Sequence, residues 1–328
     1  GGRTVGPWLT AFAFGTSYFS AVIFVGYAGQ FGWLFGLAST WAGLGNAFIG
    51  SLLAWNILGR RTRIMTQKLD AKTMPDFFGK RFDSTPLKVF ASIIVFIFLI
   101  PYTASLYNGL SSLFGLVFNV PYWVIILIMA VLTAIYVIVG GYMATAINDF
   151  IQGIIMLGGI IAVIGAVLNG QGGFLSAINK LSAVPADPSV ATDALKTMNG
   201  PFASFFGPDP LNLLGVVILT SLGTWGLPQM VQKFYAIKDE KQITKGAVIS
   251  TIFALVVAGG SYFMGGFVRL YCKVTEDGSD KTFIQSANGK PIFDDMVPAL
   301  LDSALPDMLI GLVVVLVLSA SLSTLSSL

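Results

Sequence analysis

The sequence predicts an all-α integral membrane protein, on the evidence of its apolar composition, its few charges and where those charges lie. Of its 328 residues, 55% are hydrophobic and only 11% are charged, whereas soluble domains carry about 25% charged residues. Six stretches contain no Asp, Glu, Lys or Arg: 4–59, 89–148, 150–179, 210–232, 246–268 and 308–328. A membrane-crossing helix needs about 20 apolar residues. The two longest stretches therefore hold two spans each and the other four hold one each, which predicts eight spans.

Turn-forming residues set the limits of these spans. Three glycines, at 26, 29 and 32, punctuate the first hairpin, and Asn119-Val120-Pro121 punctuates the second. The Gly140-Gly141 pair separates the fourth span from the fifth. The expected spans are approximately 7–29, 33–58, 87–117, 121–140, 147–168, 211–236, 247–271 and 307–328.

The basic residues orient the chain in the membrane. Residues 59–88 and 233–245, together with Arg3, hold 13 of the 19 Lys and Arg residues. If the spans alternate, all of these lie on one side, which the positive-inside rule makes cytoplasmic. The opposite side has six basic residues and ten acids, most of them in 273–307. We expect a multi-pass protein of the plasma (inner) membrane.

Two loops carry helical patterns. Thr73-Met-Pro-Asp76 is a capping signature that predicts a short cytoplasmic surface helix. Residues 291–304 predict an amphipathic helix on the extracellular side. We expect both helices to pack at the membrane interface rather than to bind a ligand.

The composition also excludes several functions. Histidine is absent and Cys272 is the only cysteine, which excludes histidine acid–base catalysis and metal sites built from Cys and His. The net charge of +3 is too small and scattered for nucleic-acid binding. We expect neither an enzyme nor an organic cofactor. The chain lacks an initiator Met and ends at Leu328 within an apolar run, so we expect a fragment in which 1–328 forms one transmembrane domain.

Two spans contain helix-breaking residues at mid-membrane. The first includes Phe14-Gly-Thr-Ser-Tyr-Phe-Ser20, and the sixth includes Ser221-Leu-Gly-Thr-Trp-Gly-Leu-Pro-Gln229. Unpaired backbone groups at this depth are costly unless they line a cavity or meet an ion. Interruptions five spans apart indicate the binding site of an inverted-repeat transporter. Close helix packing by small residues is the alternative.

The last span carries a stripe of hydroxyl groups. Ala320, Ser323, Thr324 and Ser327 share one helical face. Their oxygens suit a hard cation, but hydrogen bonding between helices explains the stripe equally well. An acid, Asp149, stands near the start of the fifth span. Acids at membrane depth are functional candidates, whereas an N-cap role is the simpler explanation.

Taken together, these motifs resemble the sodium/solute symporter family over essentially the whole chain. The resemblance rests on Gly140-Gly141-Tyr-Met-Ala144 with Asn148-Asp149-x-x-Gln152, on Trp225-Gly226 with Pro228-Gln229, and on Ser323-Thr324-Leu-Ser326. The last motif is closest to the proline-type branch. The resemblance implies the leucine-transporter (LeuT-like) inverted-repeat fold, with repeat helices one to eight present and the leading and C-terminal helices missing.

The resemblance also implies a set of site residues. A main sodium ion would meet the carbonyls of Thr16, Phe19 and Ala320 and the hydroxyls of Ser323 and Thr324. A second sodium, present in some members, would use Asp149 with Ser323, Ser326 and Ser327. The implied solute contacts are Ser17, Tyr18, Ser20, Tyr102, Thr224 and Trp225.

One departure bears on the solute. Proline-type members carry an acid where this chain has Tyr18, which argues against proline itself. The sequence therefore predicts sodium-coupled symport of a small organic solute (an amino acid, sugar or carboxylate) by alternating access. The alternatives are a solute-sensing membrane domain of a sensor kinase and a transporter of the same fold without sodium coupling.

Overall fold

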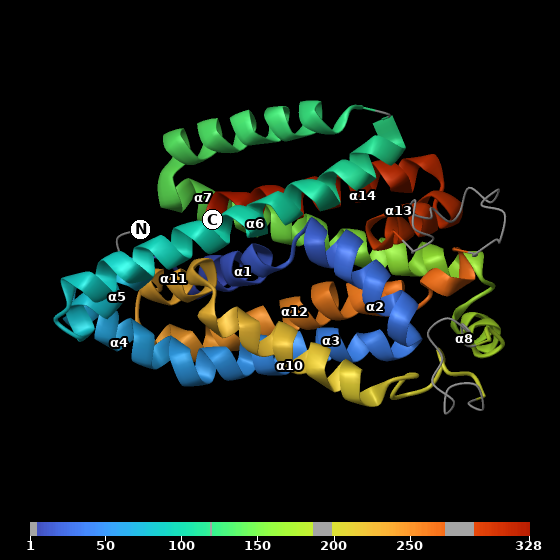
Figure 1. Ribbon diagram of the computed structural model, residues 1–328, viewed down its shortest axis with the longest axis horizontal. Helices are drawn as coiled ribbons and strands as arrows, with labels where there is room; N and C mark the ends of the chain where they lie inside the picture. The colour runs from blue at the N-terminus through green and yellow to red at the C-terminus, as the bar shows by residue number, and fades with distance from the viewer. Residues whose placement is uncertain (1–4, 119, 186–198, 273–291) are drawn as a thin grey trace.

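The computed structural model describes residues 5–118, 120–185, 199–272 and 292–328. Within these ranges the chain is almost entirely helical, and most helices run along the long axis of the molecule (Figure 1). Val5 and Ile237 form an isolated parallel bridge. In chain order the helices are α1 (Pro7–Tyr18), η1 (Val22–Tyr27), α2 (Ala28–Phe35), η2 (Gly36–Ser39), α3 (Thr40–Gly45), η3 (Asn46–Leu53), η4 (Trp55–Gly59), α4 (Arg60–Lys68), α5 (Met74–Arg81), α6 (Thr85–Phe118), α7 (Tyr122–Gly170), α8 (Phe174–Ser182), α10 (Pro210–Gly226), α11 (Pro228–Ala236), η5 (Glu240–Gln242), α12 (Ile243–Gly265), η6 (Val268–Leu270), α13 (Phe293–Ala304) and α14 (Asp307–Ser327).

Each of the eight apolar segments expected from the sequence is helical over most of its described length. Among the described residues, five helices are long and apolar enough to cross a membrane, or six when α10 and α11 count as one bent span. The number is below eight for geometric reasons. Val22–Lys68 counts as one helical stretch although it reverses direction at η2, and Trp123–Val139, within the expected fourth span, is a shorter apolar helix.

The two predicted interruptions are present, and they have nearly the same backbone geometry. Helix α1 ends where Phe19 adopts an extended conformation, with φ −76° and ψ 117°. Leu227 between α10 and α11 has φ −71° and ψ 121°, and the two helices meet at 49°. An extended residue breaks the ladder of helical hydrogen bonds, so nearby carbonyl and amide groups are released toward the centre of the bundle.

Helix α7 consists of two antiparallel segments joined at Gly141, as the glycine pair in the sequence predicted. Gly141 has φ 60° and ψ −174°, a conformation that is essentially restricted to glycine. The second segment therefore begins near Tyr142 rather than at 147. This corrects the helix-cap alternative for Asp149, because that residue lies two turns inside the helix and is fully buried.

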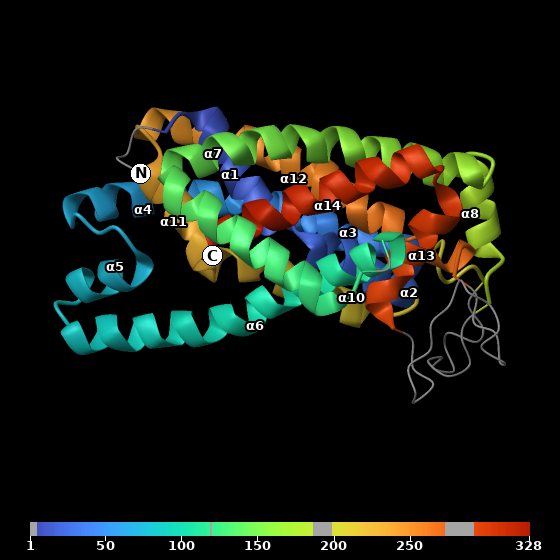
Figure 2. The same ribbon diagram turned by 90° about the horizontal axis from the view of Figure 1, so that it is seen from above.

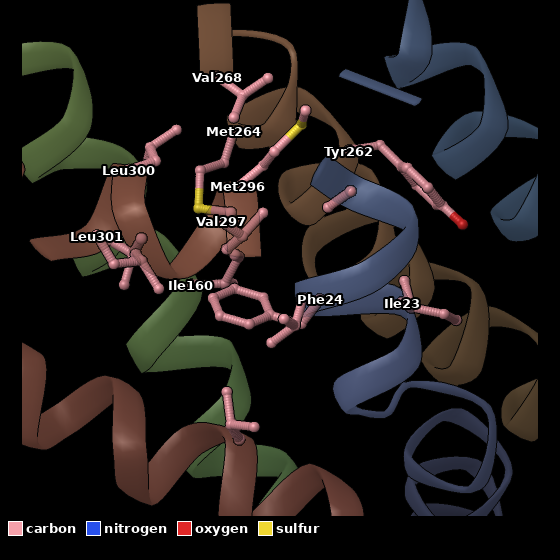
Figure 3. Close-up of a cluster of buried hydrophobic side chains, with 14 of the residues drawn as sticks. Ile23, Phe24, Ile160, Tyr262, Met264, Val268, Met296, Val297, Leu300 and Leu301 are labelled. Atoms are coloured by element: carbon pink, nitrogen blue, oxygen red, sulfur yellow. The ribbon is translucent and has the colours of Figure 1, made fainter. Parts of the chain in front are cut away.

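Both predicted surface helices form. The Thr73 side chain accepts a hydrogen bond from the backbone N–H of Asp76, which caps α5. At the other end of the molecule, the 291–304 pattern corresponds to α13, with Pro291 outside the described residues. The buried face of α13 packs on η1, α7 and α12 in one apolar cluster (Figure 3). This cluster fixes the segment that follows the break in α1.

The outer face of the bundle is apolar. Phe96 of α6 is 70% exposed and Ile138 of α7 is 81% exposed. Helix α6 also diverges from the bundle toward α5 (Figure 2). Large exposed apolar side chains on long helices are typical of lipid-facing surfaces.

Candidate functional site

The break in α1 lies directly against the hydroxyl stripe of α14. Thr324 Oγ lies 3.2 Å from the Thr16 carbonyl oxygen, 3.4 Å from that of Phe19 and 3.0 Å from that of Ala320. All four residues are buried. A threonine hydroxyl has one proton and can satisfy one of these carbonyls at a time. The cluster therefore has more acceptors than donors, which favours a bound cation.

The spacing of these oxygens also fits a cation. A hard cation held about 2.4 Å from octahedrally arranged oxygens keeps neighbouring ligands roughly 3.4 Å apart. The distances from Thr324 to the three carbonyls lie between 3.0 and 3.4 Å. The described residues contain no group of three or more Asp, Glu, His or Cys side chains that could hold a metal. A neutral oxygen cage suits a monovalent ion better than a divalent one, because little negative charge offsets the dehydration of the ion.

The fifth expected ligand, Ser323, connects this cage to Asp149. The Ser323 hydroxyl donates to Asp149 Oδ1 over 2.6 Å, and both residues are fully buried. The serine oxygen keeps lone pairs after donating its proton. Ser323 can therefore ligate a cation in the cage while it orients the carboxylate of α7.

The expected second-site serines divide between two environments. The Ser327 hydroxyl donates to the Ser323 carbonyl and lies 2.8 Å from the hydroxyl of Ser17 on α1. Ser326 donates to the same carbonyl within its own helix. No hydrogen bond from Ser326 to Asp149 is present in the described part of the chain. Ser17, an expected solute contact, joins α1 to the Ser327 end of the stripe.

A residue that the sequence reasoning missed completes this region. Lys233 of α11 lies with its Nζ 3.7 Å from Asp149 Oδ2 and 3.1 Å from Ser327 Oγ. Its side chain is 4% exposed. The charge pattern predicted a basic cytoplasmic loop at 233–245, but Lys233 is buried within α11, so its assignment to that loop is wrong. The loop follows α11, and the lysine is held inside the bundle by its ion pair. A single lysine within the helical pattern of 228–236 was the available signal.

A small cavity lies between the two helix breaks. It has a volume of about 20 Å³, which is room for about one water molecule. Tyr18 and Thr224, both expected solute contacts, line it. Its other polar lining residues, missed from the sequence, are Asn46, Ser51 and Ser250.

One buried polar group without a hydrogen-bond partner lines this cavity, and two more lie next to residues that line it. Asn46 lies beside Tyr18 and Tyr262. Within the described ranges, Asn46 Nδ2 and the Tyr262 hydroxyl are buried without a hydrogen-bond partner, and so is the Ser20 hydroxyl. Buried polar groups without partners are uncommon and call for an explanation such as a ligand. Asn46 is one of three side-chain amides in the charge-free stretch 4–59, with Gln30 and Asn56, so the sequence alone did not single it out.

The remaining two expected contacts, Tyr102 and Trp225, are not among the residues that line this cavity. Trp225 donates its indole N–H to the Ile49 carbonyl over 3.0 Å, which joins α10 to η3. Tyr102 of α6 lines a separate, larger apolar cavity of about 710 Å³ with residues 226–228. The structure thus does not bring Tyr102 and Trp225 together with Tyr18 and Thr224 in one cavity.

Comparison with known proteins identifies the family and the fold of this chain. The model of the sodium:solute symporter family matches residues 1–328. The chain belongs to the sodium:solute symporter family. Its fold is that of a Na⁺-coupled sialic acid symporter in a substrate-bound, outward-open state, with a TM-score of 0.73 at 15% identity over 99% of this chain and 63% of that one. A nucleobase–cation symporter in a closed conformation also matches, with a TM-score of 0.58 at 13% identity over 99% of this chain and 64% of that one.

Two named relatives have higher sequence identity to this chain than these solved structures. The sodium/proline symporter of Staphylococcus aureus is 30% identical over all of this chain and 59% of its own length. The osmoregulated proline transporter OpuE of Bacillus subtilis is 29% identical over 81% of this chain and 51% of its own length. The chain thus spans little more than half the length of these relatives.

Proposed function

We propose that this chain forms part of a sodium-coupled symporter that carries a small organic solute across the plasma membrane by alternating access. The observation that carries the proposal is the cage of Thr324 and three backbone carbonyls across the α1–α14 contact. Family membership and the two matching helix breaks support it.

In this proposal sodium acts by joining two helices. The ion is coordinated by carbonyl oxygens at the break in α1 and by oxygens of α14. Its affinity is therefore higher when these two helices are in contact than when they are apart. Such a difference is what lets a ligand shift a conformational equilibrium. A membrane potential of −100 mV adds about 2.3 kcal/mol of driving force per sodium ion.

The solute is proposed to bind between the two helix breaks. The present cavity is too small for it, so solute entry requires α1 to separate from α10 and α11. The cavity lining includes no Asp, Glu, Lys or Arg side chain. A charged group on the solute would therefore be met by the helix ends exposed at the breaks. A small amino acid, sugar or carboxylate remains the proposed class. The named relatives make proline the first amino acid to examine, although Tyr18, in place of the acid of proline-type members, argues against it.

The proposed orientation of the chain in the membrane follows from the uneven distribution of its Lys and Arg residues. We propose that 59–88 and the loop from Ile237 to Lys245 face the cytoplasm. Arg60 and Glu240 form an ion pair between these segments, which supports placing them on the same side.

The test is uptake by the full-length protein in proteoliposomes. Radiolabelled proline, other small amino acids, sugars and carboxylates are supplied under an inward sodium gradient or a matched potassium gradient. We expect accumulation of at least one solute only with sodium. Equal uptake in both gradients would rule out sodium coupling.

A further inference from the structure

The second cation position implied by the family resemblance is already next to a positive charge from the protein. Of the four residues expected there, Asp149, Ser323 and Ser327 are joined by hydrogen bonds or ion contacts to one another or to Lys233. The Lys233 ammonium lies between the carboxylate of α7 and the hydroxyl of α14. The ammonium also lies over the face of the Tyr142 ring, 5.6 Å from the ring centre.

We propose that the Lys233 ammonium takes the place of a second sodium ion, so that this transporter binds one sodium per protein. This inference rests on the proposed sodium-coupled function. It assigns Lys233 a role that the sequence motifs do not give it, and it decides the ion stoichiometry.

Charge balance is the first argument. A buried carboxylate or ammonium without a partner is very costly. Asp149 and Lys233 are both buried, with side chains 0% and 4% exposed, and each supplies the opposite charge to the other. Among the described residues, no other ion pair to Asp149 is present. A sodium ion added here would be a second positive charge beside one carboxylate, and it would be repelled by the ammonium.

Ligand availability is the second argument. The ammonium has three donors and no acceptor. One of them is directed to the Ser327 oxygen, and that hydroxyl already interacts with Ser17 and with the Ser323 carbonyl. Asp149 Oδ1 accepts from Ser323. Asp149 Oδ1 and Ser327 Oγ are thus occupied by protein contacts. Asp149 Oδ2, which has no hydrogen-bond partner among the described residues, lies 3.7 Å from the Lys233 ammonium.

The main cage is not affected in this way. Four of its five proposed ligands are the carbonyls of Thr16, Phe19 and Ala320 and the Thr324 hydroxyl, and among the described residues none of these forms a hydrogen bond with Lys233. The fifth, Ser323, donates its proton to Asp149 and keeps lone pairs for the ion. An ammonium tethered to α11 also remains with the protein through the cycle, whereas a sodium ion leaves. The coupling charge carried per cycle is therefore that of one ion.

The experiment counts sodium ions directly. Purified full-length protein is titrated with ²²Na⁺ without solute, and the number of ions bound per protein is measured at saturation. We expect one ion, with a Hill coefficient of one. Lys233→Met removes the ammonium and keeps a long side chain, so Asp149 should recruit a second ion and the count should rise to two. Lys233→Arg keeps the charge and should bind one.

A double variant isolates the carboxylate. Lys233→Met with Asp149→Asn has neither charge and should return to one ion. Two ions bound by the wild-type protein would overturn the inference while leaving sodium coupling intact. A Lys233→Met protein that folds and still binds one ion would also overturn it. Absence of any saturable ²²Na⁺ binding by the wild type would instead refute the proposed function. If Lys233→Met does not fold, the wild-type and Lys233→Arg counts still decide the question.

Discussion

Substitution of Thr324 by valine tests the cation cage most directly. Valine has nearly the shape of threonine but no oxygen, so the change removes one of five proposed sodium ligands and leaves the backbone in place. In the structure, the Thr324 hydroxyl is the group on which three carbonyls converge. We expect sodium binding to weaken strongly while the fold is retained.

The size of the effect follows from the geometry. An interaction between a polar group and a charged one contributes about 1.5–3 kcal/mol when it is buried. Each 1.4 kcal/mol is about tenfold in affinity. The half-saturating sodium concentration should therefore rise by roughly 10- to 150-fold. Thr324→Ser keeps the oxygen and should change it by less than about threefold.

Two matched controls separate ligation from loss of a buried hydroxyl. Thr251 of α12 is also buried, and its hydroxyl donates only to the Ala247 carbonyl of its own helix. Thr251→Val should leave sodium affinity unchanged. Thr16→Val is sharper still, because only the carbonyl of Thr16 faces the cage and its hydroxyl donates to the Phe12 carbonyl. Its sodium affinity should change by less than about threefold.

The assay is equilibrium ²²Na⁺ binding to the purified full-length protein without solute, with thermal stability measured alongside. Sodium binding by Thr324→Val as tight as that of the wild type would contradict the proposed cage. Equal weakening by Thr251→Val and Thr324→Val would also contradict it, since the effect would then reflect general loss of a buried hydroxyl.

Two further substitutions test how the helices are joined. Gly141→Ala places a side chain at φ 60° and should cost about 1–3 kcal/mol in stability. Gly158→Ala, in helix with open space at its Cβ, should be neutral or slightly stabilising; equal melting shifts for the two would contradict the strained hinge. Trp225→Phe loses the hydrogen bond to Ile49 and should lower stability by about 1 kcal/mol with little change in solute affinity, whereas a tenfold loss of affinity at unchanged stability would return Trp225 to the solute site.

Some features of the site were predictable because they depend on local sequence. Gly, Pro and hydroxyl residues within apolar spans weaken the helix where they stand, so the breaks at Phe19 and Leu227 could be located before the structure was known. The stripe on α14 follows from helical periodicity alone. The hinge at Gly141 follows from glycine's access to positive φ.

Other features depend on which helices meet, and local sequence does not contain that information. From local sequence, Lys233 is predicted to be one more positive charge beside a loop, and Asp149 is predicted to be a helix cap. Their side chains come within 3.7 Å only because α7 and α11 both pack against α1. Tyr102 lies in a separate cavity beside the second break, and the Trp225 indole bonds to the Ile49 carbonyl of η3, contacts that depend on how whole helices pack.

The sequence by itself determined that the chain is a bundle of apolar helices with two breaks and an oxygen-rich stripe, because periodicity, charge and helix propensity act over a few neighbouring residues. Only the tertiary structure decided that the stripe faces the first break and that a lysine stands beside the buried acid. Those pairings join residues 84 to 308 positions apart. They are fixed by the packing of whole helices, where burying a charge is tolerated only if its partner arrives from another element.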